Sequence, residues 1–211
     1  MEKVKKIAAR PKLRLVKSRH SPGFAVGAVD VVAAPENKPL FTPDAVAYEE
    51  DTFLVLSAPL EVREPQKPLS RLATEVREME PEIPGTVLAK GKSPVRLLAV
   101  VHDLNQEPSW QEEWITSALE GIFREVERRK LSSLALPFLG TRHGSLEKER
   151  FLWLLRSVLE RIVPRSLKRV CLMLPPGTDP KMLGELNASR RGKKESDPQN
   201  TRKARGHLRV R

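Results

Sequence analysis

Cysteine is almost missing from this chain of 211 residues, in which Cys171 is the only one. A single thiol excludes a disulfide within the chain, and because Cys171 stands in the apolar run 170–174, we expect a buried and unreactive side chain. No apolar run approaches the length of a membrane-spanning helix, and the lysine-rich first residues lack the apolar stretch of a signal peptide. We therefore expect a soluble, cytoplasmic protein without a membrane partner.

Motifs for metal binding and for reading nucleic acid are missing too. The four histidines have no second His or Cys at the spacing that a metal site requires, so we expect no metal and no cofactor. Helix-turn-helix patterns, zinc-ligand pairs and basic segments interleaved with aromatic residues do not occur either. This leaves charge as the only basis for binding nucleic acid.

Positive charge is what the chain has in excess, and it is concentrated at the two ends. The formal net charge is +11, yet residues 1–20 carry eight basic side chains against one acidic, and residues 188–211 carry nine against two. Residues 21–187 are therefore mildly acidic. Basic ends of this kind bind nucleic acid weakly and without reading its sequence, although such segments more often serve only solubility.

Three regions follow from these patterns. Residues 1–20 form a basic N-terminal segment, in which the alternation over 12–17 suits an edge strand. Residues 21–187 hold the apolar content and have the size of one α/β domain. Residues 188–211 are too poor in apolar side chains to repay the entropy of ordering, so we expect a disordered basic tail.

The order of the expected elements indicates an α/β fold. Strand patterns cover 24–34, 44–48, 52–58, 95–102, 134–139 and 167–174, and helical patterns cover the segment between Pro65 and Pro84, 109–129 and 146–163. Ser109 and Glu112 have the spacing of a capping box at the start of the second helix. Buried strands that alternate with helices over short connections predict a three-layer α/β/α arrangement around a mixed, largely parallel sheet.

The stretch 140–145 lies between an expected strand and an expected helix. At such a junction the first amides of the helix have no carbonyl partner and the helix dipole adds positive charge, so an anion is stabilised there. Gly140 and Gly144 let the backbone turn and approach a phosphate, and Arg142 and His143 add donors. Because ordinary strand-to-helix turns share this pattern, the loop alone is a weak signal.

The position of a second segment supports the signal from the loop. His102 and Asp103 come at the end of the buried strand 95–102, and ligands of open α/β sheets gather where parallel strands end. For His102, a hydrogen bond at the strand end is the alternative interpretation. We therefore expect a ligand site formed by His102, Asp103 and the loop residues Gly140, Thr141, Arg142, His143, Gly144 and Ser145.

Residues 85–187 resemble the second half of a macro domain. The resemblance rests on the strand that ends in Val100-Val101-His102, on the helix with two tryptophans, and on the segment Pro137-Phe138-Leu139-Gly140-Thr141-Arg142-His143-Gly144. In that family the corresponding loop wraps the diphosphate of ADP-ribose, and the fold is a mixed six-stranded sheet between helices. Gly140, Thr141 and Gly144 match the family loop, whereas Arg142 replaces a glycine.

The first half of the chain departs from the family pattern. The family's Asn-Ala-Ala-Asn signature has no equivalent, and the matching strand is one of three segments: 44–48, 29–37 or 53–58. In the first register Tyr48 stands where the family has its distal-ribose asparagine, so no catalytic residue is assigned. Asp44 and Asp30 are each either a counterpart of the family's adenine-contacting aspartate or a carboxylate at a turn or strand end.

Two functions from different classes remain. The resemblance implies binding of ADP-ribose or a related nucleotide diphosphate at the 140–145 loop, with or without hydrolysis of an ADP-ribose derivative. The alternative is a nucleic-acid-associated or protein-interaction module with basic ends, in which the macro-like body is a non-catalytic scaffold. We leave enzymatic activity open and expect a monomer.

Overall fold

The computed structural model describes residues 13–14, 23–36, 38–57, 80–162, 164–175 and 178. The tail expected over 188–211 lies outside these residues, as do the apolar positions of the helix expected between Pro65 and Pro84. Within the described part of the chain, no helix is long and apolar enough to cross a membrane.

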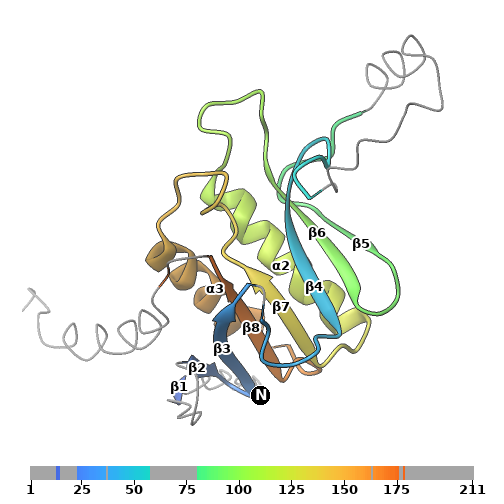
Figure 1. The fold of residues 1–211 in the computed structure, drawn as a ribbon, viewed down its shortest axis with the longest axis vertical. Helices are drawn as coiled ribbons and strands as arrows, with labels where there is room; N and C mark the ends of the chain where they lie inside the picture. Colours follow the sequence, from blue (N-terminus) through green and yellow to red (C-terminus); the bar gives the residue numbers. More distant parts are fainter. Residues whose placement is uncertain are drawn as a thin grey trace, which may run out of the picture.

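An eight-stranded mixed sheet forms the centre of the protein (Figure 1). Its strands in chain order are β1 (Leu13–Arg14), β2 (Gly23–Val26), β3 (Val29–Pro35), β4 (Ala45–Asp51), β5 (Val87–Lys90), β6 (Val95–His102), β7 (Ser133–Pro137) and β8 (Arg169–Leu174). Across the sheet the order is β1-β2-β3-β8-β7-β4-β6-β5. Strands β3, β8, β7, β4 and β6 run parallel, whereas β1, β2 and β5 pair antiparallel at the two edges.

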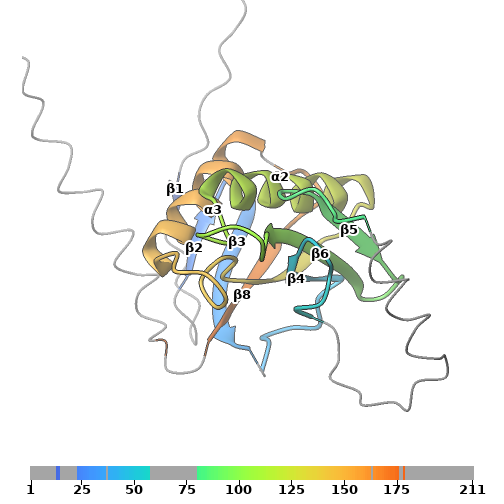
Figure 2. The ribbon, with the colours of Figure 1, turned by 90° about the horizontal axis from the view of Figure 1, so that it is seen from above.

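In the described part of the chain, α2 (Glu112–Arg128) and α3 (Lys148–Ile162) cover one face of the sheet (Figure 2). Their apolar side chains recur every three or four residues, so each helix presents one apolar face to the core. The buried face of α2 consists of Ile115, Ala118, Leu119, Ile122, Phe123 and Val126. Alternate strand residues such as Ala45 and Ala47 belong to the same core cluster.

The fold class expected from the sequence is confirmed, because the sheet is mixed, largely parallel and combined with helices. The strand expected over 95–102 is β6 with the same bounds, and most of its residues are buried. Cys171 is buried in β8, and burial raises the pKa of its thiol, as an unreactive side chain requires.

The sheet is larger than the six strands that the resemblance implied. The run expected as one strand over 24–34 is an antiparallel hairpin, in which Phe24 faces Val31. Gly27 makes the turn with a φ of 61°, a backbone conformation that favours glycine. β1 adds a strand outside this hairpin, and β5 is a further edge strand that the sequence patterns did not predict.

The strand expected over 52–58 is not formed at its described residues, 52–57. β4 instead continues to Asp51, whose carboxylate then accepts the backbone N–H groups of Phe53 at 2.6 Å and Val55 at 3.2 Å. Leu54 has a positive φ of 59°. A side chain that bonds the backbone two and four residues ahead folds the chain into a turn, which excludes a strand.

The capping box expected from Ser109 and Glu112 is also wrong. α2 begins at Glu112, and its N-cap Gln111 forms no side-chain hydrogen bond to the helix. The Ser109 hydroxyl pairs instead with Nδ1 of His102 at 3.2 Å. Glu112 accepts two hydrogen bonds from Arg150, at 2.7 and 2.6 Å, and so joins the start of α2 to α3.

Candidate functional site

The carboxyl ends of the parallel strands lie on one side of the sheet, and a cleft of about 550 Å³ reaches from these ends along the strands as far as Val46 and Pro94. Its polar wall includes Glu36 after β3, Glu49 near the end of β4, and three residues of the loop after β7. Its apolar wall includes Val46, Leu56, Pro94 and Met173. A concave site with an apolar wall and a few convergent polar groups is typical of small-molecule binding.

Packing and backbone geometry fix the loop at its two glycines. Gly140 has a φ of 75°, and a Cβ on this residue would lie 2.5 Å from Cδ1 of Ile115. A Cβ on Gly144 would lie 2.5 Å from the carbonyl oxygen of Gly140 and 2.5 Å from Cδ1 of Trp110. Both positions therefore exclude larger residues unless the loop or α2 moves.

The backbone amides of the loop fall into two groups. The N–H of Gly140 donates to Oε2 of Glu49 at 3.1 Å, and the N–H of Thr141 donates to the carbonyl of Phe138 at 3.2 Å. The next four amides, those of Arg142, His143, Gly144 and Ser145, form no hydrogen bond within the described part of the chain. Successive unpaired amides at a turn before a helix form the donor set that anions bind in proteins.

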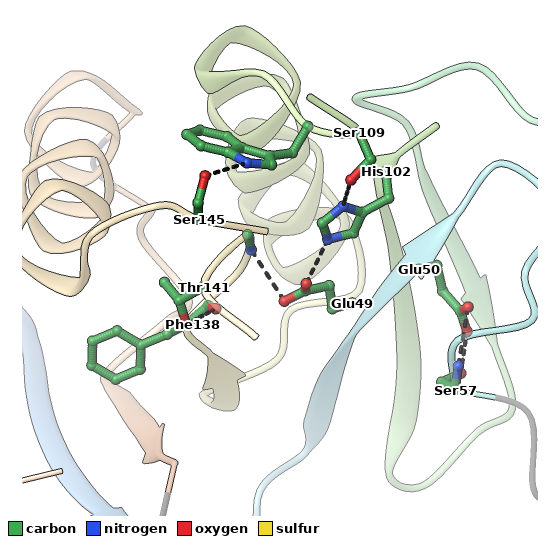
Figure 3. A network of polar contacts seen from close by, with 10 residues as sticks. Glu49, Glu50, Ser57, His102, Ser109, Phe138, Thr141 and Ser145 are labelled. Carbon is green, nitrogen blue, oxygen red and sulfur yellow. Dashed lines mark hydrogen bonds and ion pairs between the residues drawn. The ribbon is translucent and has the colours of Figure 1, made fainter. Parts of the chain in front are cut away.

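Behind the loop lies a hydrogen-bonded chain of three side chains (Figure 3). His102 is fully buried, and its Nε2 lies 2.6 Å from Oε1 of Glu49. Since a carboxylate accepts, this contact places a proton on Nε2, and Nδ1 then accepts from the hydroxyl of Ser109. The carboxylate of Glu49 is thus held by donors on both oxygens, from His102 and from Gly140.

Two further contacts shape the cleft around the loop. The guanidinium of Arg142 forms a hydrogen-bonded ion pair with Glu36, which lies beyond the end of β3. Both side chains are exposed, so the pair is accessible to solvent and contributes little to stability. The His143 ring meets the His102 ring edge-on, with centroids 6.1 Å apart.

Solved macrodomains resemble this chain in fold. The Oceanobacillus iheyensis macrodomain with ADP matches with a TM-score of 0.56 and 16% identity, over 85% of this chain and 98% of that one. The same macrodomain with MES bound matches at 0.54 and 18%, over 77% and 92% of the two chains. A glycine-to-valine mutant of it with ADPR matches at 0.54 and 16%, over 78% and 94%. No family model and no curated protein matches the sequence.

The chain has a macrodomain fold. The likeness is divergent in sequence, which fits a resemblance that the sequence shows mainly in residues 85–187. In three dimensions it extends well beyond that range, because the matches cover more than three quarters of the chain.

The fold brings most of the expected site residues together. Thr141, Arg142 and His143 line the cleft, Gly140 adjoins them, and His102 stands behind Glu49. Gly144 lies against Trp110, whose Nε1 donates to the Ser145 hydroxyl at 3.3 Å. The loop and the end of β6 therefore lie side by side, whereas their ligand-binding role stays a prediction.

Two of the expected site residues are placed elsewhere. The Asp103 carboxylate closes its own turn, accepting from the N–H of Asn105 at 3.0 Å and from Nε2 of Gln106 at 2.6 Å, and it does not line the cleft. Asp44 stands just before β4, at the amino ends of the parallel strands, whereas the loop follows the carboxyl end of β7. There it accepts from the N–H and hydroxyl of Ser132 and from the N–H of Ser133.

These contacts are those of a carboxylate at a turn, the alternative that the sequence left open for Asp44, and its ligand-binding role stays a prediction. Asp30, the other candidate aspartate, sits near the start of β3 and does not line the cleft either. Both aspartates stand near the amino ends of their strands, away from the loop that follows β7.

The sequence reasoning missed Glu49 and Glu36. Glu49 belongs to an acidic trio, residues 49–51, that was interpreted as a separator between two strands. A signal was available in their position in the chain. These acidic residues end a strand that runs parallel to its neighbours, so they stand at the carboxyl ends of the strands. Within the described residues, no cluster of His, Cys, Asp or Glu is arranged to hold a metal ion.

Proposed function

We propose that this cleft binds a nucleotide diphosphate of the ADP-ribose class, with its phosphates at the 140–145 loop. The observation that carries the proposal is the run of four unpaired amides from Arg142 to Ser145, in a loop of which Thr141, Arg142 and His143 line the cleft. A phosphate oxygen that accepts several backbone N–H groups forms charge-assisted hydrogen bonds, which are about twice as strong as neutral ones.

The likeness in fold to solved macrodomains supports the same ligand class. Structures of the Oceanobacillus iheyensis macrodomain contain ADP and ADPR. This chain shares their fold and, independently, carries unpaired loop amides beside its cleft.

The remainder of the cleft suits the uncharged parts of such a ligand. Val46, Leu56, Pro94 and Met173 offer an apolar surface for a base or sugar, and Tyr48 adds a phenol. The Arg142 guanidinium can exchange its exposed partner Glu36 for a ligand phosphate, since both groups lie at the cleft. We assign no reaction to the cleft, and hydrolysis of an ADP-ribose derivative is a separate question for a turnover assay.

Titration calorimetry of the full chain with ADP-ribose tests the proposal. We expect saturable binding of one ligand per chain, with a Kd of about 1–100 µM, which corresponds to about 5.5–8 kcal/mol. Absence of heat with ADP-ribose, ADP and other nucleoside diphosphates at millimolar concentration would refute it.

A parallel titration with duplex DNA addresses the alternative function. Binding through the basic ends falls steeply as salt rises from about 50 to 200 mM, because each neutralised phosphate releases counterions. Strong, salt-sensitive DNA binding without any nucleotide binding would favour the nucleic-acid function over the cleft.

A further inference from the structure

The charges of the folded body are divided between the two ends of its parallel strands. Residues 21–187 are mildly acidic as a whole, and acidic side chains such as Glu36, Glu49 and Asp103 stand where β3, β4 and β6 end. The amino ends of the strands carry exposed basic side chains instead. Six of these form what we call the basic rim: Lys92, Arg96, Lys130, Arg165, Lys168 and Arg169.

Hydrogen bonds join the segments that carry the basic rim. The N–H of Val95, at the start of β6, donates to the carbonyl of Asp44 at 2.9 Å. The Asp44 carboxylate accepts the N–H of Ser132 at 2.8 Å, and the Ser132 carbonyl accepts the N–H of Lys168 at 2.8 Å. The starts of β6, β4, β7 and β8 therefore form one continuous rim, and the three strand spacings across it amount to about 14 Å.

The positive charges of the basic rim have no carboxylate partners. All six side chains are exposed, and none forms an ion pair with a carboxylate of the described residues. The Lys168 ammonium group donates only to the backbone carbonyl of Arg165, at 3.0 Å. An exposed cation of this kind can meet an external anion without first giving up an internal ion pair.

Carboxylates near the basic rim are fewer than its cations. Asp44, Glu127 and Asp30 contact the same segments, and the Glu127 carboxylate accepts the backbone N–H groups of Arg165 and Ser166, each at 2.9 Å. Six cations against three carboxylates leave an excess of three positive charges. The other carboxylates at this end pair with arginines outside the rim, and they are Glu120, Glu125 and Glu160.

The aromatic rings beside the basic rim are already covered. The guanidinium of Arg169 lies 4.4 Å from the centre of the Phe41 ring, and that of Arg96 lies 4.9 Å from the centre of the Tyr48 ring. Proteins that hold single-stranded nucleic acid stack its bases on free aromatic rings. A rim with cations and with covered rings suits a phosphate backbone whose bases stay paired.

We propose that the basic rim binds the phosphate backbone of double-stranded nucleic acid without reading its sequence. A duplex carries one negative charge per about 1.7 Å of its axis, so a rim of about 14 Å faces about eight charges. This contact belongs to the folded body, and it orients the duplex at the amino ends of the strands, whereas basic chain ends alone would not orient it. The proposal does not depend on nucleotide binding in the cleft.

Fluorescence anisotropy of a labelled duplex of about 30 base pairs measures binding by the full-length chain, for which we expect a Kd of about 1–100 µM at physiological salt. The variant with Lys130→Gln, Arg165→Gln and Lys168→Gln removes three charges from the rim. Each lost phosphate contact makes the slope of log K against log salt shallower by about 0.9, so we expect a change of about 2.7. The affinity should fall at least tenfold.

The matched control removes the same charge from the other end of the strands. Lys38→Gln, Lys148→Gln and Arg150→Gln together lie after β3 and at the start of α3, and none of the three residues lines the cleft. We expect at most a threefold loss of affinity and an unchanged salt slope, with folding of both variants checked by thermal melting. Equal losses in the two variants would mean that only net charge matters, which would overturn the proposal.

A third variant separates the rim from the basic C-terminal segment. Lys193→Gln, Lys194→Gln and Lys203→Gln remove three charges from residues 188–211. Because the two sets of residues act independently, their effects on the free energy of binding should add when the two variants are combined. Unchanged binding by the rim variant, beside a large loss in this one, would assign duplex binding to the chain ends alone.

Two further titrations test the orientation and the class of partner. β7 has five residues and so places about 17 Å between the rim and the 140–145 loop. Saturating duplex should therefore leave any ADP-ribose binding unchanged within twofold, and competition between them would place the duplex in the cleft and refute the proposal. Vesicles that contain phosphatidylserine are the other polyanion, and rim-dependent binding to them without duplex binding would assign the rim to a membrane surface instead.

The two proposals fail separately. A chain that binds duplex through the rim but binds no nucleotide loses only the function proposed for the cleft. A chain that binds ADP-ribose but does not bind duplex at physiological salt loses only the function proposed for the rim.

Discussion

The two ends of β4 each carry a carboxylate that ties the strand to its neighbours, yet they serve different purposes. At the amino end, Asp44 accepts three hydrogen bonds of 2.7–3.0 Å from Ser132 and Ser133. At the carboxyl end, Glu49 accepts from His102 and Gly140, and Glu49 lines a cleft. The first connection closes a turn on the surface, and the second forms the wall of a site.

The two ends of β4 differ in whether the backbone N–H groups nearby have hydrogen-bond acceptors. Around Asp44, the N–H groups of Ser132 and Ser133 are both taken by its carboxylate. Beyond Glu49, four loop amides from Arg142 to Ser145 have no partner within the described part of the chain. A strand end beside unpaired backbone N–H groups can accommodate an anion, whereas a strand end whose neighbouring N–H groups already have acceptors cannot. The following predictions test this contrast, from the largest expected effect to the smallest.

Replacing Gly144 by valine should abolish nucleotide binding, with a loss of at least fiftyfold in calorimetry. The added Cβ would lie 2.5 Å from both the Gly140 carbonyl oxygen and the Trp110 ring, so the loop must move. Overpacking of this kind also costs about 1–3 kcal/mol of stability. Ser132→Ala, which removes a donor at the other end of β4, should leave binding intact. Equal binding by the Gly144 variant and the wild type would show that the loop is structural.

His102→Ala should destabilise the fold more than Asp44→Ala. His102 is fully buried, so its removal leaves a cavity and a nearly buried Glu49 without its main donor, at a cost of about 2–3 kcal/mol. Asp44 is only half-buried, and we expect about 1 kcal/mol for its loss. Urea denaturation of both variants measures the free energies of unfolding. A larger loss in the Asp44 variant would contradict the contrast between the two ends.

Arg142→Ala should weaken nucleotide binding about tenfold, at the low end of what a charge-assisted hydrogen bond contributes, since the side chain is exposed. Glu36→Gln should strengthen binding about twofold, because it frees the guanidinium. Arg142→Gly restores the glycine of the family loop and should behave like Arg142→Ala. Tighter binding of ADP-ribose by the glycine variant would mean that Arg142 blocks the ligand.

The smallest effect is a pH dependence at the amino end of β4. The hydrogen bond from the Ser132 hydroxyl, helped by the backbone of Ser132 and Ser133, lowers the pKa of Asp44. A lowered pKa contributes stability at neutral pH that is lost as the pH falls through the folded-state value. The difference in stability between wild type and Asp44→Asn should therefore shrink from about pH 7 to about pH 2. A difference that grows in acid would contradict this account of Asp44.

Sequence patterns predicted the parts of the fold that depend on local periodicity. β6 was predicted with its observed bounds, and α2 and α3 within a few residues. A buried strand and an amphipathic helix each have a characteristic pattern of apolar residues in the sequence. The hairpin at Gly27 was predicted as one strand, since two short buried strands and one long strand have similar composition. The turn after Asp51 was missed because its hydrogen bonds come from a side chain.

The candidate site was only half predictable for a different reason. The loop residues Gly140 to His143 carry a local signal, and they do lie at the cleft. Glu49 and Glu36 carry no local signal, because their roles depend on the order of the strands in the sheet. They lie at the ends of β4 and β3, which β7 and β8 separate in the sheet, and the sequence pattern does not give this order.

The strand order also governs how the protein reaches its native state. β4 pairs with β6 and β7, so Ala45 faces Val95 on one side and Leu134 on the other, and the cleft needs residues from Glu36 through Pro175. These pairings join segments that are far apart in the sequence, and closing the large loops between them costs conformational entropy. They therefore form late in folding. A nascent or truncated chain without β7 and β8 therefore lacks the part of the cleft wall that these strands supply. If the proposed binding holds, a bound ligand reports that β7 and β8 have joined the sheet, and a ligand at 100 times its Kd adds about 2.7 kcal/mol to the stability of the fold.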